Sequence, residues 1–255
     1  MKNAIFYSVI FAALQLVVSS AAQLVWNYVL GESGVMSTIF MLSTLTAFNV
    51  LAMVLFLAAK WAVVSPHWVR TRPWMVLFWC VMAALGSIVP SMWLQEVMPA
   101  LPNLMEADLD GLMSHRMGYF VIGLLAPLVE ELVFRGAILR SLLKWNQNHW
   151  LCICISAALF AIVHFNPAQM PHAFLVGWLL GWLYYRTGSI VPGVAVHWVN
   201  NSVAYVMYNL SKAAYGTGDP TMAQLFGEER VLLAVLFSLC MLVPAIYQLN
   251  LRMKR

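Results

Sequence analysis

The stretch Leu128-Val-Glu-Glu-Leu-Val-Phe-Arg-Gly136 places two adjacent glutamates and an arginine inside a run that is otherwise apolar. An ionisable side chain at the centre of a membrane helix costs about 2.5–3.5 kcal/mol on insertion scales, and such groups usually have a function. Two further apolar segments each contain a histidine, His164 and His197. Polar groups on three separate apolar segments indicate an active site assembled between membrane helices.

The composition around these segments is that of a polytopic membrane protein. Of the 255 residues, 62% are hydrophobic and 9% are charged, and the mean hydropathy is +0.80. A soluble protein carries about 25% charged residues. All four cysteines lie in apolar runs without the spacing of a zinc site, so we expect buried, unpaired thiols.

Hydropathy predicts an all-α bundle of about eight transmembrane helices, forming a single integral membrane domain over residues 1–255. Long links are expected only at Pro99–Arg116 and Ser211–Arg230. The predicted spans are Ala4–Leu30, Ser37–Val64, Trp74–Met98, Met117–Trp145, Trp150–Phe165, His172–Tyr185, Ile190–Leu210 and Val231–Leu249.

The charges in the loops predict the orientation of this bundle. In the eight-span arrangement, Arg116, Lys212 and Arg230 fall on one side of the membrane and the other 11 of the 14 lysines and arginines fall on the opposite side. The positive-inside rule then places both termini in the cytoplasm, in a plasma membrane that we expect to be bacterial. The net charge of +4 reflects this bias, so we expect contacts with membrane lipids and none with nucleic acid.

The first span has two interpretations. Lys2, the apolar run and Ser19-Ser-Ala-Ala-Gln23 are compatible with a cleaved signal peptide. However, Gln15, Ser19, Gln23 and Asn27 recur every four residues, which predicts a polar stripe packed inside the bundle. We favour a retained helix.

The two glutamates of the first motif are expected to differ in role. Glu131 and Arg135 are four residues apart, so they share a helix face and can form an ion pair. Glu130 is rotated away from that face and has no partner in the sequence. This suits one carboxylate that holds structure and another that exchanges protons with water.

The second motif, Phe160–His164, is placed by the geometry of a helical hairpin. Trp145-Asn-Gln-Asn-His149 is the only polar break between the fourth and fifth spans. Glu130 lies 17 residues before Gln147, and His164 lies 17 residues after it. At about 1.5 Å per residue, both side chains lie about 25 Å from the turn, at one level on facing helices. For His197 to meet them, the hairpin must extend about 15 Å into the cytosol.

The third motif sets His197 and Asn201 on one helix face, with Asn200 turned away from it. A histidine and an amide on one face can donate hydrogen bonds to a developing oxyanion. Gly193, near the start of this span, is expected to allow a close approach of the backbone to a substrate.

These three motifs together resemble those of the CAAX protease and bacteriocin-processing family. The resemblance covers residues 117–210 and rests on Glu130–Arg135, Phe160–His164 and His197–Asn201. It implies an intramembrane endopeptidase, and we expect its substrate to be a membrane-associated or lipidated peptide. Glu130 and His164 would activate water, His197 and Asn201 would stabilise the oxyanion, and Glu131 and Arg135 would support the site.

Two questions stay open at this level. We expect no cofactor and no metal, but zinc bound by Glu130, His164 and His197 is the alternative, although no H-E-x-x-H motif occurs. A non-proteolytic role as a membrane binding or bacteriocin-immunity protein is the alternative to catalysis. A proton-coupled transporter ranks third, because the sequence shows no inverted repeat.

Overall fold

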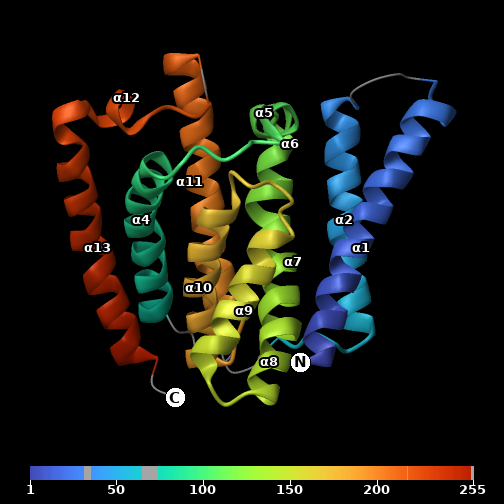
Figure 1. The fold of residues 1–255 in the computed structure, drawn as a ribbon, viewed down its shortest axis with the longest axis horizontal. Coiled ribbons are helices and arrows are strands. Elements are labelled where there is room, and N and C mark those ends of the chain that lie inside the picture. Colours follow the sequence, from blue (N-terminus) through green and yellow to red (C-terminus); the bar gives the residue numbers. More distant parts are fainter. Residues whose placement is uncertain (32–35, 65–73, 217, 254–255) are drawn as a thin grey trace.

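The structure is a computed structural model that describes residues 1–31, 36–64, 74–216 and 218–253. These residues form helices and connecting loops without a strand, which confirms the all-α prediction. Arg70, Arg72, Lys254 and Arg255, whose charges entered the orientation prediction, lie outside the described residues. Eight helical segments follow the predicted spans (Figure 1): α1 (Lys2–Leu24) with η1 (Val25–Val29), α2 (Thr38–Ala58), α4 (Trp74–Val97), the run from α6 to α8 (Arg116–Trp145), α9 (His149–Ile162), α10 (Met170–Thr187), α11 (Val191–Tyr215) and α13 (Val231–Arg252).

Five of these segments are long and apolar enough to cross a membrane: Lys2–Val29, Thr38–Ala58, Trp74–Val97, Arg116–Trp145 and Glu228–Arg252. The helix α9 is apolar but has only 14 residues, fewer than the about 20 that span a bilayer. The helices α10 and α11 carry more polar residues. The chain is therefore an integral membrane protein with several apolar spans, and the count of eight stays a prediction.

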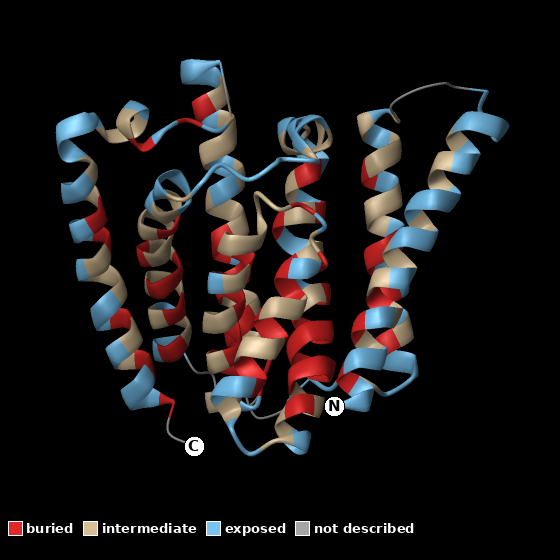
Figure 2. Cartoon of the chain, in the orientation of Figure 1, coloured by how far each residue is buried: buried red, intermediate tan, exposed pale blue. Residues whose placement is uncertain are grey.

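The helices form a central group with a pair on either side (Figure 1). The central group is α7 (Ala126–Val133), α9, α10 and α11, with α1 and α2 packed on one side and α4 and α13 on the other. Figure 2 shows the buried residues concentrated along these central helices. The helices α9 and α10 approach closely at Gly177, where a Cβ atom would meet Phe160 and Ala157 at 3.1–3.3 Å. Both ends of the described chain lie at the same end of the bundle as the α8–α9 turn.

The span that carries the two glutamates is not a regular α-helix. It runs through α6 (Arg116–Gly118), η2 (Tyr119–Leu125), α7, η3 (Phe134–Leu139) and α8 (Arg140–Trp145), and both η2 and η3 are π-helical. At the end of η2 the N–H of Ala126 donates to the carbonyl of Val121, five residues back. In that register the next carbonyl, Ile122, would pair with residue 127, which is a proline without an N–H. The Ile122 carbonyl is thus left for another donor.

Several boundaries differ from the sequence predictions. The helix α9 ends at Ile162, so His164 lies in the following turn and not within the span. The two long links contain short helices, α5 (Glu106–Ser114) and α12 (Met222–Phe226) followed by η4 (Glu228–Arg230). The helix α11 extends past Leu210 to Tyr215.

Two predictions about burial hold only in part. In the polar stripe of α1, Ser19 and Asn27 are exposed, Gln15 and Gln23 are partly buried, and the Gln23 amide donates to the Asn27 amide oxygen at 2.9 Å. The buried face of α1 carries Ala4, Ser8 and Phe11 instead. All four cysteines are free as expected, but only Cys80 and Cys152 are buried, Cys154 is partly exposed and Cys240 is exposed.

Candidate active site

The predicted ion pair between Glu131 and Arg135 is present and completely buried. Nη1 of Arg135 donates to Oε1 of Glu131 at 2.6 Å, and both side chains are 0% exposed. Nη2 donates to the Gly177 carbonyl at 3.1 Å, and the guanidinium lies 4.6 Å from the centre of the Phe160 ring. These contacts tie α7 and η3 to α9 and α10, so the pair fixes the helices that carry the other polar groups.

Gly193 brings the start of α11 against this carboxylate. A Cβ atom at this position would lie 2.5 Å from Oε2 of Glu131. The sequence predicted a close approach of the backbone to a substrate, but the group approached is Glu131. Among the described residues, Oε2 of Glu131 and Nε of Arg135 are buried without a hydrogen-bond partner.

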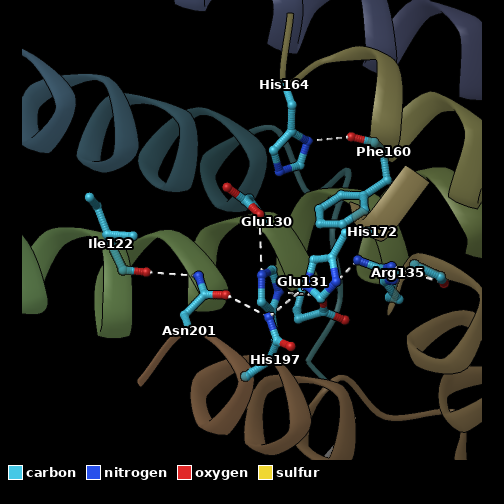
Figure 3. A network of polar contacts seen from close by, with 11 residues as sticks. Ile122, Glu130, Glu131, Arg135, Phe160, His164, His172, His197 and Asn201 are labelled. Carbon is cyan, nitrogen blue, oxygen red and sulfur yellow. Dashed lines mark hydrogen bonds and ion pairs between the residues drawn. The ribbon is translucent and has the colours of Figure 1, made fainter. Parts of the chain in front are cut away.

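His197 lies between the two glutamates. Its Nδ1 is 3.1 Å from Oε1 of Glu131, and its Nε2 is 3.7 Å from Oε2 of Glu130 (Figure 3). The imidazole is buried, whereas the Glu130 side chain is 22% exposed and Glu131 is 0% exposed. A carboxylate can only accept, so an Nδ1–H donated to Glu131 orients the ring with Nε2 toward Glu130. The buried Glu131 fixes the orientation of His197, and the more accessible Glu130 faces Nε2 of the same ring.

His164 reaches the same cluster from the turn after α9. Its Nδ1 lies 2.8 Å from the Phe160 carbonyl, so Nδ1 must carry the proton and Nε2 is left as an acceptor. The Phe160 ring contacts both imidazoles edge-on, with centroids 4.9 Å from His164 and 5.6 Å from His197. Figure 3 shows the His164 ring directed toward Glu130, as the hairpin geometry predicted.

Asn201 is held by the carbonyl that the π-helical turn leaves free. Its Nδ2 donates to the Ile122 carbonyl at 3.0 Å (Figure 3). A primary amide has two N–H groups, so one remains for another acceptor. The structure brings together all six residues that the sequence predicted, namely Glu130, Glu131, Arg135, His164, His197 and Asn201.

Zinc bound by Glu130, His164 and His197 was the alternative to a metal-free site. Within the described ranges, no three histidine, cysteine, aspartate or glutamate side chains lie close enough to hold one ion. His197 directs Nδ1 to Glu131 and His164 directs Nδ1 to a backbone carbonyl, so Nε2 of each ring stays on the side of Glu130. The metal content of the protein stays a prediction.

Three side chains near the site were not predicted to take part in it. His172, at the start of α10, lies between Ser91 of α4 and Asn200 of α11. Asn200 is buried and also contacts Asn201. A third histidine in an apolar segment was a signal for His172, but its partners are 81 and 28 residues away and no local spacing connects them.

The chain is similar to known proteins over the part that carries the three motifs. Residues 114–203 match the model of a family described as type II CAAX prenyl endopeptidase Rce1-like. The chain is 31% identical over 115 residues to the UPF0177 protein YxdF of Lactococcus lactis, covering 44% of this chain and 55% of that protein. It is 29% identical over 105 residues to the "Putative membrane peptidase YdiL" of Bacillus subtilis, covering 40% and 41% of the two chains. No solved structure matches the chain significantly.

The matched family and one of the two relatives are described as peptidases. The matched stretch contains all three motifs, and this confirms the resemblance to the CAAX protease and bacteriocin-processing family over residues 114–203. The chain spans about half the length of the curated relatives that it matches.

Proposed function

We propose that this protein is an intramembrane endopeptidase that hydrolyses a peptide bond in a membrane-associated or lipidated protein or peptide. The observation that carries the proposal is the contrast between the two glutamates. Glu131 is fully buried and neutralised by Arg135, whereas Glu130 is partly exposed beside two histidines. Similarity to type II CAAX prenyl endopeptidases supports the same reaction.

In the proposed mechanism, Glu130 and Nε2 of His164 bind one water molecule. Glu130 takes a proton from this water as its oxygen attacks the scissile carbonyl carbon, and the carbonyl oxygen becomes an oxyanion. The C–N bond then breaks, and the proton held by Glu130 is transferred to the leaving amine. The products are a carboxylic acid and an amine, so the reaction consumes one water and needs no other reactant.

His197 and the free N–H of Asn201 are proposed to receive the oxyanion. Glu130, Glu131 and Arg135 together carry a formal charge of −1, and a proton on His197 would bring these four side chains to zero. In that state the Nε2–H group of His197 donates to the oxyanion, while its Nδ1–H group stays hydrogen-bonded to Glu131. The resemblance supplies no substrate sequence, so the substrate is proposed only as a class.

The test compares wild type with Glu130→Gln in proteoliposomes, using internally quenched peptides with and without an attached lipid. We expect turnover to fall by at least about 100-fold in Glu130→Gln, while thermal unfolding is unchanged. Glu229→Gln, at an exposed glutamate outside the site, is the matched control and should keep full activity. Equal turnover in wild type and Glu130→Gln would contradict the mechanism. Peptide binding without cleavage by the wild type would favour the non-proteolytic alternative.

A further inference from the structure

His172 contacts the candidate site through a partly buried chain of hydrogen bonds. Its Nδ1 lies 2.6 Å from Oγ of Ser91, and its Nε2 lies 3.3 Å from Nδ2 of Asn200. The same Nδ2 lies 3.2 Å from Oδ1 of Asn201, whose own amide nitrogen is bound to Ile122. Figure 3 shows His172 and Asn201 on either side of His197. Four helical segments, α4, α10, α11 and η2, contribute to this chain.

The direction of every bond in the chain follows from its last member. The Ile122 carbonyl can only accept, so the Asn201 amide must turn Nδ2 toward it and Oδ1 toward Asn200. Asn200 must then donate to that oxygen, and its second N–H is donated to Nε2 of His172. His172 therefore carries its proton on Nδ1 and donates it to Ser91. The reverse orientation of either amide would set two acceptors or two donors against each other.

We propose that His172 and Asn200 are positioning residues that fix the orientation of the Asn201 amide. With Oδ1 occupied by Asn200 and one N–H occupied by Ile122, the amide plane is fixed and the second N–H keeps one direction. This inference rests on the proposed function, because that N–H is assigned to the oxyanion. His172 itself touches neither the substrate nor the reacting water.

The chemistry of the chain predicts which substitutions His172 tolerates. Glutamine can donate one N–H to Ser91 and accept from Asn200 through its carbonyl oxygen, as the histidine does. Leucine fills a similar volume but can do neither. Without an acceptor at this position, the Asn200 amide is free to rotate and the Asn201 amide loses its fixed partner.

The kinetic test measures kcat and KM for His172→Leu and His172→Gln. We expect His172→Leu to lower kcat at least tenfold with KM within about twofold, because one oxyanion donor contributes about 10²–10³ in kcat. His172→Gln should stay within about threefold of wild type. His149→Leu, at a ring that stacks on Tyr185 away from the site, is the control and should be fully active.

A second arm separates positioning from a general loss of structure. In an Asn201→Ala background, His172→Leu should cause no further loss, because the group that it positions has been removed. An additive loss there, or equal losses for His172→Leu and His172→Gln, would overturn the proposal. If His172→Leu does not fold, Ser91→Ala takes its place, since it removes only the acceptor for Nδ1.

A third measurement does not depend on peptidase activity. In the NMR spectrum of protein labelled with 15N-histidine, the signals of His172 are those that disappear in His172→Gln. These signals should show a protonated Nδ1 and an unprotonated Nε2. The opposite tautomer would refute the chain of donors. Should the wild type cleave no peptide, the proposed function fails, while the tautomer still decides whether this network exists.

Discussion

Gly193→Ala tests whether the position of the buried Glu131 carboxylate controls catalysis. The new Cβ atom would lie 2.5 Å from Oε2 of Glu131, and ordinary contact begins at 3.4 Å, so the carboxylate and the helix must separate by about 0.9 Å. Glu131 is held by Arg135 at 2.6 Å and by His197 at 3.1 Å, so this shift distorts both contacts. Because a misplacement of about 1 Å can cost 10²-fold in rate, we expect kcat to fall about 100-fold.

The same substitution should change stability much less. Overpacking costs about 1–3 kcal/mol, but alanine in a helix gains up to about 1 kcal/mol over glycine, so the two effects partly offset. Turnover and thermal unfolding should therefore be measured on the same preparation. Gly111→Ala is the matched control, because its nearest neighbours are the ends of the Thr38 and Met41 side chains, at 3.1 and 3.7 Å, outside the site. Wild-type turnover in Gly193→Ala would refute the reasoning.

Further predictions concern charge, topology and metal. Glu131→Gln should lose both activity and about 3–5 kcal/mol of stability, since it leaves Arg135 buried without its counter-charge. Glu130→Gln should melt like wild type, and identical melting temperatures of the two variants would contradict this division of roles. In a cysteine-free background, Asp108→Cys should be labelled from outside intact cells and Lys2→Cys only after permeabilisation, and the reverse pattern would invert the proposed orientation. Metal analysis of active enzyme should find no stoichiometric zinc, and activity that is lost on chelation and restored by zinc would defeat the metal-free mechanism. Lys212 and Tyr208 donate hydrogen bonds to Asp110 and lower its pKa. Their contribution to the stability of the folded protein should be present above about pH 4 and be lost as the pH falls through the lowered pKa. Asp110→Asn should lack this pH-dependent contribution.

The helices and the residues of the site were predictable because they depend on local sequence. Hydropathy over about 20 residues locates a helix whatever its neighbours are, so all eight segments lie near their predicted positions. An ionisable group in an apolar run is visible for the same reason, and so is the four-residue spacing of Glu131 and Arg135.

The orientation of the side chains was not predictable, because it depends on contacts between distant segments. Hydropathy does not distinguish a π-helical turn from an α-helical one, so the free Ile122 carbonyl gave no signal. His172 finds Ser91 across 81 residues, and the chain has no pattern that links the two. The end of α9 was also missed, since the residues that follow Ile162 are apolar enough to continue the span.

The proline at position 127 has a consequence for attempts to stabilise this protein. Restoring an N–H there would give the Ile122 carbonyl a backbone partner within its own helix and should raise the melting temperature of the protein. The same N–H would compete with Asn201 for that carbonyl and release the amide from its fixed direction. Selection for thermal stability alone should therefore favour replacements of Pro127 that fold better and work worse, so a trade-off between robustness and activity is concentrated at a residue that carries no reactive group.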